Sequence, residues 1–390
     1  LKYSKYLMLI LSILIFFYCF YKKKYFNNFL LYSISIVSTI ILFIIRDANI
    51  LTGLRYYRGG ADGILHFSYG REITHNLFNK NYIDALMGVE EIFYFMPGLR
   101  YFSSISNILF GENSFGYVLI CSFIPLIIYK ILERLINRKW AIILFISFIF
   151  LPIFENMGFG YFNYVWQVAR FHAETISILF ILIALYLIIK KRKNQDENDI
   201  FYYFISMFLS VAVFLRPNFF PTSIILFVFV IYLFYERRDF KLLFCNVTGY
   251  SLIFLSLIHN YYYGNDIIFF TDSGVNFKLN IFELAEGILS IITLDFNNPN
   301  LLILKSQFFD WNPLYNIHRL LIVFFIIISF LIKKHESIFY VIFSCMISQH
   351  IVLFLTYSSS RYAYLAWLLT FILFVYLISK MNFWKSKNAL

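Results

Sequence analysis

Long apolar runs recur along almost the whole chain, and they constrain its fold more than any other feature. Hydrophobic residues make up 61% of the 390 residues, and charged residues only 14%. A water-soluble domain cannot bury so much apolar surface, so the chain is expected to cross a bilayer many times. Only helices and closed barrels satisfy their backbone in lipid. We therefore predict an all-α, polytopic transmembrane protein that forms a single transmembrane domain over 1–390.

The apolar runs predict about eleven membrane helices. A helix needs about 20 residues to cross the hydrocarbon core. The runs lie at about 6–21, 29–46, 115–131, 141–155, 172–189, 200–215, 219–235, 241–262, 318–332, 338–356 and 362–380. Several are shorter than the required length, so one of them could be re-entrant. The first run lacks a small-residue cleavage site, and we expect it to be a retained span.

Positive charge predicts the orientation of these spans. Short loops on one side carry 19 of the 33 Lys and Arg residues, which by the positive-inside rule marks the cytoplasmic side. The N-terminus is then outside and the C-terminus cytoplasmic, in a bacterial plasma membrane. Loops 47–114, 155–171 and 263–317 face outward. The net charge of +11 comes largely from the inner loops and does not call for a nucleic-acid partner.

Arginine, in contrast, gathers on the outer side. Nine of the 14 outer basic residues are Arg, against five of 19 on the inner side. A planar guanidinium binds phosphate or carboxylate bidentately, whereas orientation needs only a charge. The outer face therefore indicates a site for an anionic headgroup, although any single Arg can equally snorkel or pair with an acid.

Three carboxylates of the outer loop 47–114 lie within about thirty residues of one another at a bilayer surface, where carboxylates are costly. Asp62 follows two glycines, and Glu90 and Glu91 precede a second apolar stretch. We predict these three as catalytic residues of a site whose substrate arrives through the lipid. Asp62 also fits a helix cap, where the helix dipole favours a carboxylate. Adjacent Glu90 and Glu91 point in different directions, so we expect one of them to face the site.

An amphipathic helix is predicted directly after Asp62, from Ile64 to Asn79. Its apolar stripe consists of Leu65, Tyr69, Ile73 and Leu77, and its polar face of Ser68, Glu72, His75 and Asn79. We expect it to lie in the plane of the membrane interface. Farther along the chain, Arg170 and Glu174 are spaced to pair on one helix face.

These features together resemble the GT-C superfamily of integral-membrane glycosyltransferases, which use polyprenyl-phosphate sugars. Gly60-Ala61-Asp62-Gly63-Ile64-Leu65-His66 looks like the acidic loop of that family as it enters its first juxtamembrane helix. Arg216-Pro217-Asn218 and Arg361-Tyr362 are similar to its Arg-containing motifs at span ends. The sequence departs from the pattern by one additional early span and by Ala61, which separates the glycines from the acid.

The resemblance implies a fold and an activity. A sugar would pass with inversion from a polyprenyl-phosphate donor to a lipid-linked or cell-surface glycan acceptor on the outer face, with Asp62 as general base. The loop 263–317 would serve as an outer lid that recognises the acceptor. Binding of the donor phosphate would fall to Arg170, Arg216, Arg361, Arg58 and Arg100.

Three alternatives stay open at this stage. A divalent metal, Mg²⁺ or Mn²⁺, could be held by Asp62, Glu90 and His66, which offer hard oxygen ligands and an imidazole. An O-antigen-type polymerase or ligase of lipid-linked glycans would instead depend on His318 and Arg319. A lipid or glycan transporter would need polar residues near mid-membrane and often has internal repeats, whereas this sequence shows no repeat and its spans are nearly free of charge.

Overall fold

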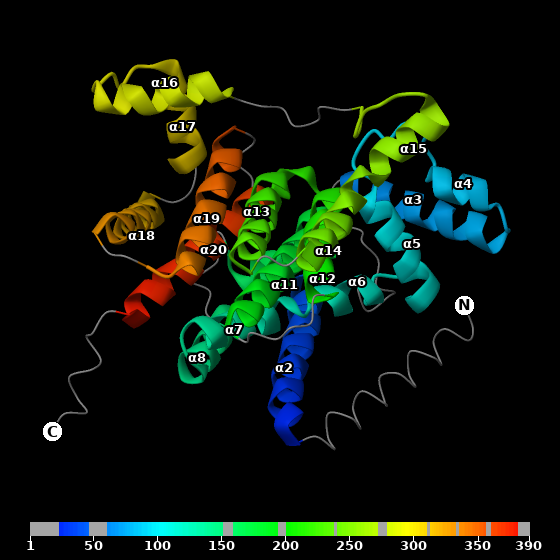
Figure 1. Cartoon of the computed structure of the whole chain (residues 1–390), viewed down its shortest axis with the longest axis horizontal. Helices are drawn as coiled ribbons and strands as arrows, with labels where there is room; N and C mark the ends of the chain where they lie inside the picture. Colours follow the sequence, from blue (N-terminus) through cyan, green and yellow to red (C-terminus); the bar gives the residue numbers. More distant parts are fainter. Residues whose placement is uncertain are drawn as a thin grey trace.

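The computed structural model is helical throughout the residues that it describes. These are residues 23–46, 61–150, 159–193, 200–237, 240–271, 279–309, 313–332, 335–355 and 360–380. No strand occurs among them, and the all-α prediction is confirmed (Figure 1). The α-helices are α2 (Lys23–Arg46), α3 (Ala61–Phe78), α4 (Tyr82–Met87), α5 (Gly98–Phe110), α6 (Phe115–Cys121), α7 (Ile124–Leu135), α8 (Arg138–Phe150), α10 (Tyr161–Ala169), α11 (Ala173–Lys193), α12 (Ile200–Leu215), α13 (Phe220–Arg237), α14 (Phe240–Tyr250), α15 (Leu255–Gly264), α16 (Ile281–Ile292), α17 (Pro299–Phe309), α18 (Pro313–Ile332), α19 (Ser337–Leu355) and α20 (Ser360–Lys380). Two 3-10 helices are η2 (Pro217–Phe219) and η3 (Ser251–Phe254).

Several of these helices are long and apolar enough to cross a membrane. Five such stretches are Phe115–Leu135, Ala173–Arg192, Phe240–Gly264, Ser337–Leu355 and Arg361–Lys380. Four shorter apolar helices are Asn28–Leu42, Ile200–Leu215, Pro217–Leu233 and Arg319–Leu331. Each overlaps a run that the sequence predicts to span, which is the pattern of a membrane protein. The first predicted run, 6–21, lies outside the described residues, and the count of eleven spans stays a prediction.

The core forms around α11, which packs against α7 and α12. Ile176, Leu179, Leu182 and Leu185 of this helix are all buried. A helix that is apolar on all sides is expected in the interior, whereas a surface helix is apolar along one face only. In Figure 1 α11 and α12 lie in the middle of the molecule, with the other long helices around them.

A second contact of this core brings α12 against α14 at very short range. Gly249 of α14 faces α12, and a Cβ at this position would lie 2.4 Å from the Tyr203 carbonyl oxygen. The absence of a side chain therefore sets the spacing between the two helices.

The predicted amphipathic helix is present as α3, which begins three residues earlier than the predicted Ile64. It packs against α5 through a face that carries Gly70 and Thr74: a Cβ on Gly70 would lie 2.4 Å from Ser103 Cβ, and the Thr74 hydroxyl donates to the Ser104 hydroxyl at 3.1 Å. Ile73 is buried, and Ser68 and Glu72 on the opposite face are exposed. This helix thus packs against protein, and its placement in the plane of a membrane interface stays a prediction.

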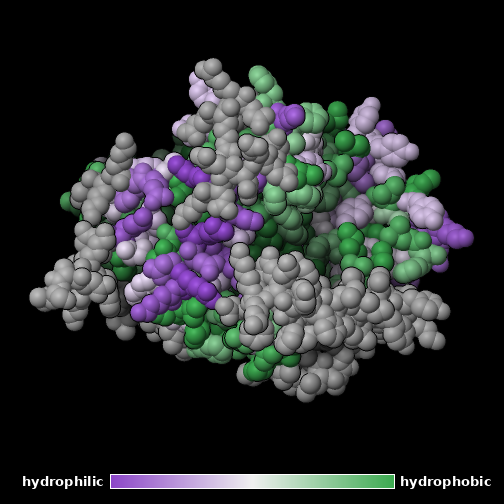
Figure 2. Space-filling model, turned by 60° about the horizontal axis from the view of Figure 1, so that its bottom comes forward, coloured by the Kyte–Doolittle hydropathy of each residue, from purple (hydrophilic) through white to green (hydrophobic). Residues whose placement is uncertain are grey.

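Two segments predicted to face outward, named the outer segments after that prediction, lie at opposite ends of the view in Figure 1. Figure 1 shows α3, α4, α5 and α15 together at one end and α16 and α17 at the other, beyond α19. The basic start of α2 and the turn between α7 and α8 lie toward the bottom of that view. Figure 2 brings the bottom forward and shows hydrophilic side chains gathered in one patch bordered by apolar surface.

Replacing Gly249 with alanine is expected to destabilise the protein. Alanine favours a helix over glycine by about 1 kcal/mol, but overpacking against a backbone oxygen costs about 1–3 kcal/mol, so the clash decides the sign. Val247→Ala, on the exposed side of the same helix, is the matched control. Thermal unfolding in detergent should show a lower Tm for Gly249→Ala alone; equal Tm values would contradict the packing argument.

Candidate functional site

Three arginines lie at or next to helix termini. Arg170 follows α10, Arg216 follows α12 and Arg361 is the second residue of α20. The first break has Phe171 in the left-handed region, at φ 54°. At the second break Pro217 excludes helical backbone from the residue before it, and Arg216 is extended at φ −151° and ψ 111°. Each break places a long cationic side chain at a helix end.

Arg216 and Arg361 converge on the buried carboxylate of Glu174. The Glu174 Oε1 atom lies 3.1 Å from Arg216 Nε and 3.7 Å from Arg361 Nε. The Glu174 side chain is only 2% exposed, whereas those of Arg216 and Arg361 are 21% and 23% exposed. The carboxylate therefore anchors the two guanidinium groups from within and leaves part of each open to the surroundings.

Tyr362 contacts the same two arginines through its hydroxyl and its ring. Its hydroxyl accepts hydrogen bonds from Arg216 Nη2 at 2.6 Å and from Arg361 Nη2 at 3.4 Å. Both guanidinium groups also lie near the Tyr362 ring, about 5 Å from its centroid. The arrangement fixes the position of the arginines more firmly than one ion pair would.

The predicted pairing of Arg170 with Glu174 is wrong. An i,i+4 pair needs one continuous helix, but α10 ends at Ala169 and α11 begins at Ala173. The ion pairs of Glu174 go to Arg216 and Arg361 instead. The Arg170 guanidinium stacks on Trp166, with Cζ 3.8 Å from the ring centroid.

Arg170 nevertheless belongs to the same electrostatic environment. Burial, with a smaller contribution from the positive charge of Arg361, lowers the pKa of Arg170 below its usual value. We call Arg170, Arg216, Arg361, Glu174 and Tyr362 the arginine cluster. Three positive charges face one negative charge, so its formal charge is +2. Its like charges repel one another, and an anion would relieve that repulsion.

The outer segment that carries α3 and α5 is docked beside this cluster through two glycines. A Cβ on Gly63 would lie 2.1 Å from the Arg170 carbonyl oxygen. A Cβ on Gly98 would lie 2.4 Å from the Phe214 carbonyl oxygen, two residues before Arg216. Both positions need glycine because backbone touches backbone there. The first turns of α3 and of α5 are thereby held close to the arginine cluster.

Asp62 lies in this docked first turn of α3, next to Gly63. Its side chain is outside the described part of the chain, as is Arg58, so their predicted roles stay predictions. His66, one turn further along α3, is buried and lies 6.0 Å from the Phe95 ring, centroid to centroid. The backbone placement brings the predicted catalytic acid to the same helix ends as the predicted phosphate-binding arginines.

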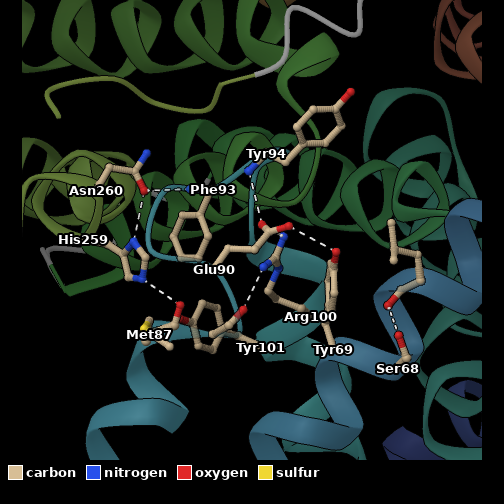
Figure 3. A network of polar contacts seen from close by, with 12 residues as sticks. Ser68, Tyr69, Met87, Glu90, Phe93, Tyr94, Arg100, Tyr101, His259 and Asn260 are labelled. Carbon is tan, nitrogen blue, oxygen red and sulfur yellow. Dashed lines mark hydrogen bonds and ion pairs between the residues drawn. The ribbon is translucent and has the colours of Figure 1, made fainter. Parts of the chain in front are cut away.

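Glu90 and Arg100 form a separate ion pair within the outer segment (Figure 3). Arg100 Nη2 donates to Glu90 Oε2 at 2.7 Å, and Nη1 donates to the Gly88 carbonyl oxygen at 2.7 Å. The Arg100 side chain has no exposed surface, and its guanidinium lies 4.4 Å from the Tyr69 ring centroid. Glu90 also accepts from the Tyr69 hydroxyl at 3.1 Å. The pair closes the loop between α4 and α5 onto α3.

The loop between α4 and α5 also contacts α15, through two side chains that were not predicted as site residues. Asn260 Oδ1 accepts from the Phe93 amide at 3.0 Å, and Asn260 Nδ2 donates to the Ile268 carbonyl oxygen at 2.8 Å. The His259 ring stacks on Phe93 at 3.7 Å and lies 2.8 Å from the Met87 carbonyl oxygen. A histidine and an asparagine in an apolar run were the only sequence signal for this contact.

The predicted site residues thus separate into two groups. Arg170, Arg216 and Arg361 gather in the arginine cluster, whereas Arg100 and Glu90 form an ion pair with each other. Glu91 is exposed. Glu174 and Tyr362, which organise the cluster, were not predicted as site residues; their position at the start of an apolar run was the available signal.

The possible metal ligands do not gather among the described residues. No group of three or more His, Cys, Asp or Glu side chains lies close enough there to hold a metal ion. Glu90 already accepts hydrogen bonds from Arg100, Tyr69 and the Tyr94 amide. With the Asp62 side chain outside the described part, the set of Asp62, Glu90 and His66 stays a prediction.

No protein-family description, no curated protein and no solved structure matches this chain.

Glu90 and Glu91 are expected to differ sharply in their contribution to stability. Glu90→Ala leaves the fully buried Arg100 charge without its carboxylate, and breaking a buried pair in this way costs about 3–5 kcal/mol. Glu91→Ala changes an exposed position and should shift the free energy of unfolding by less than about 0.5 kcal/mol. Denaturant unfolding of both variants measures the difference; a similar loss in both would contradict the structural role of Glu90.

Proposed function

We propose that this protein is a membrane glycosyltransferase that transfers a sugar from a polyprenyl-phosphate donor to a glycan or glycolipid acceptor on the outer face of a bacterial plasma membrane. The proposal includes eleven spans, an outer N-terminus and a cytoplasmic C-terminus. The placement of the basic helix ends of α2, α7 and α8 on one side of the molecule supports this orientation.

The observation that carries the proposal is the arginine cluster. Its formal charge is +2, its carboxylate is buried, and two of its guanidinium groups are partly exposed. A phosphate that becomes the leaving group gains negative charge in the transition state, and fixed cations stabilise that charge without reorganising. Guanidinium groups held by Glu174 and Tyr362 meet this requirement better than flexible surface lysines would.

Asp62 is the proposed general base. In this reaction its carboxylate removes the proton from an acceptor hydroxyl, and the hydroxyl oxygen attacks the anomeric carbon of the donor sugar. The bond from the anomeric carbon to the phosphate oxygen breaks, and polyprenyl phosphate leaves with both bonding electrons. A single displacement inverts the anomeric centre. The mechanism needs Asp62 and the arginines at one site, and the docking of α3 beside Arg170 supports that proximity.

A polymerase or ligase of lipid-linked glycans is a second candidate, and one observation favours it. Arg319 near the start of α18 is buried, with its guanidinium 4.8 Å from the Trp367 ring centroid. The His350 ring lies 4.9 Å from the same Trp367 ring. In that reaction Arg319 would serve the substrate and Asp62 would be dispensable.

Asp62→Asn is expected to abolish sugar transfer while the protein remains folded. Loss of a positioned general base costs about 10²–10⁴-fold in rate. The assay uses purified protein in liposomes with radiolabelled polyprenyl-phosphate sugars and lipid acceptors, and it follows release of polyprenyl phosphate. Asp84→Asn, an exposed acid on α4 in the same outer loop, is the control and should retain activity. Full activity of Asp62→Asn would exclude Asp62 as the base.

Arg216→Lys tests the phosphate role with little change in charge. A lysine can still pair with Glu174 but lacks the planar fork, so we expect transfer to fall by about 10²–10³-fold, as for loss of one preorganised donor. Arg71→Lys, at an exposed arginine paired with Glu112 at 3.0 Å, is the matched control. If Arg319→Lys abolishes activity and Arg216→Lys does not, the polymerase or ligase becomes the better assignment.

A further inference from the structure

The outer segment formed by α16 and α17 is a helical hairpin built on the end of a candidate membrane span. Leu279, Leu284 and Leu304 form its small core, and Phe354 and Leu355 at the end of α19 pack against that core. The hairpin therefore sits at the level where α19 ends, and its position is fixed by direct contact with that helix.

The first helix of the hairpin is well defined. Asn280 and Glu283 form a reciprocal capping box: Asn280 Oδ1 accepts from the Glu283 amide at 2.9 Å, and Glu283 Oε2 accepts from the Asn280 amide at 2.7 Å. Glu286 accepts from Asn300 Nδ2 of α17 at 3.1 Å. Gly287 lets α17 approach, because a Cβ there would lie 2.7 Å from Leu304 Cδ1.

Three different faces run along α16. One face, with Leu284, Gly287 and Ser290, is buried against α17. A second face carries Glu283 and Glu286. The third face is apolar and has no contact partner within the hairpin; its exposed large side chains are Ile281, Phe282, Ile288, Leu289 and Ile292.

The third face exposes so much apolar surface that we expect another apolar surface to cover it. Phe282 is 86% exposed and Ile292 is 74% exposed. A contiguous apolar stripe of this kind on a helix is stable in contact with water only at considerable cost.

We propose that α16 lies in the outer leaflet of the membrane, with its apolar face among the phospholipid acyl chains and its two glutamates toward water. Figure 1 shows α16 lying across the direction of α19, beyond the end of that helix, as a helix in the plane of a bilayer would. Contact with Phe354 and Leu355 holds it at the boundary of the hydrocarbon region. Carboxylates avoid hydrocarbon, so the face with Glu283 and Glu286 is directed toward water.

This assignment differs from the expected role of loop 263–317 as a lid, which stays a prediction. In Figure 1 α16 and α17 lie beyond the end of α19, away from α3 and α5. The inference requires that the chain spans a membrane in the proposed orientation, but it does not depend on glycosyl transfer.

Fluorescent labels at single cysteines test the proposal in the full-length protein reconstituted in phosphatidylglycerol–phosphatidylethanolamine vesicles. The four native cysteines are first replaced with alanine, and folding is checked by gel filtration. The labelled variants are Phe282→Cys and Leu289→Cys on the apolar face, with Glu286→Cys as the control on the acidic face. Asp295→Cys, in the exposed loop after α16, is a second water-side control that leaves the contacts between α16 and α17 intact.

The labels at 282 and 289 are expected to lose fluorescence when the vesicles contain lipids with brominated acyl chains, and to keep it when iodide is added to the water. The labels at 286 and 295 should lose fluorescence when iodide is added and keep it when the acyl chains are brominated. Iodide quenching at 282 and 289 as strong as at 295 would overturn the proposal, because the face would then be in water. Protection from both quenchers would also overturn it, since protein, such as a second copy, would then cover the face.

Discussion

The arrangement at the outer end of the helices depends on one buried carboxylate. Glu174 holds Arg216 and Arg361, which come from helices far apart in the sequence. Unit charges about 4 Å apart interact by about 4 kcal/mol at an effective dielectric constant of about 20, so without Glu174 the gathered guanidinium groups would push these helix ends apart. Glu174 holds two of the three arginines, and the cluster keeps a formal charge of +2. That imbalance suits the binding of an anion.

The three predicted carboxylates of the outer loop have different surroundings. Glu90 neutralises the buried Arg100 and closes the loop between α4 and α5, whereas Glu91 is exposed. Asp62 occupies the turn of α3 that Gly63 brings against Arg170. The Glu90 carboxylate is occupied by Arg100, Tyr69 and the Tyr94 amide, so it is not free to contact a substrate. Asp62 therefore stays the proposed base.

The two outer segments are attached to the rest of the protein in different ways. The segment with α3 and α5 is docked on the arginine cluster through Gly63 and Gly98, so its position is set by backbone contact. The hairpin of α16 and α17 is attached to α19 and directs an apolar face away from the protein. Both contain amphipathic helices: α3 packs against α5, and the apolar face of α16 is proposed to contact lipid.

The sequence by itself determined the helical class, the positions of most apolar helices, the existence of α3 and the presence of Arg170, Arg216 and Arg361 at helix ends, because apolar runs and helical periodicity are local properties. Only the tertiary structure decided which charges pair. The break at Phe171 separates Arg170 from Glu174, and long-range packing brings Arg216 and Arg361 to that carboxylate instead. Likewise, the stripe of α3 looked interfacial in sequence because periodicity shows that a face is apolar, whereas the fold selects what covers it.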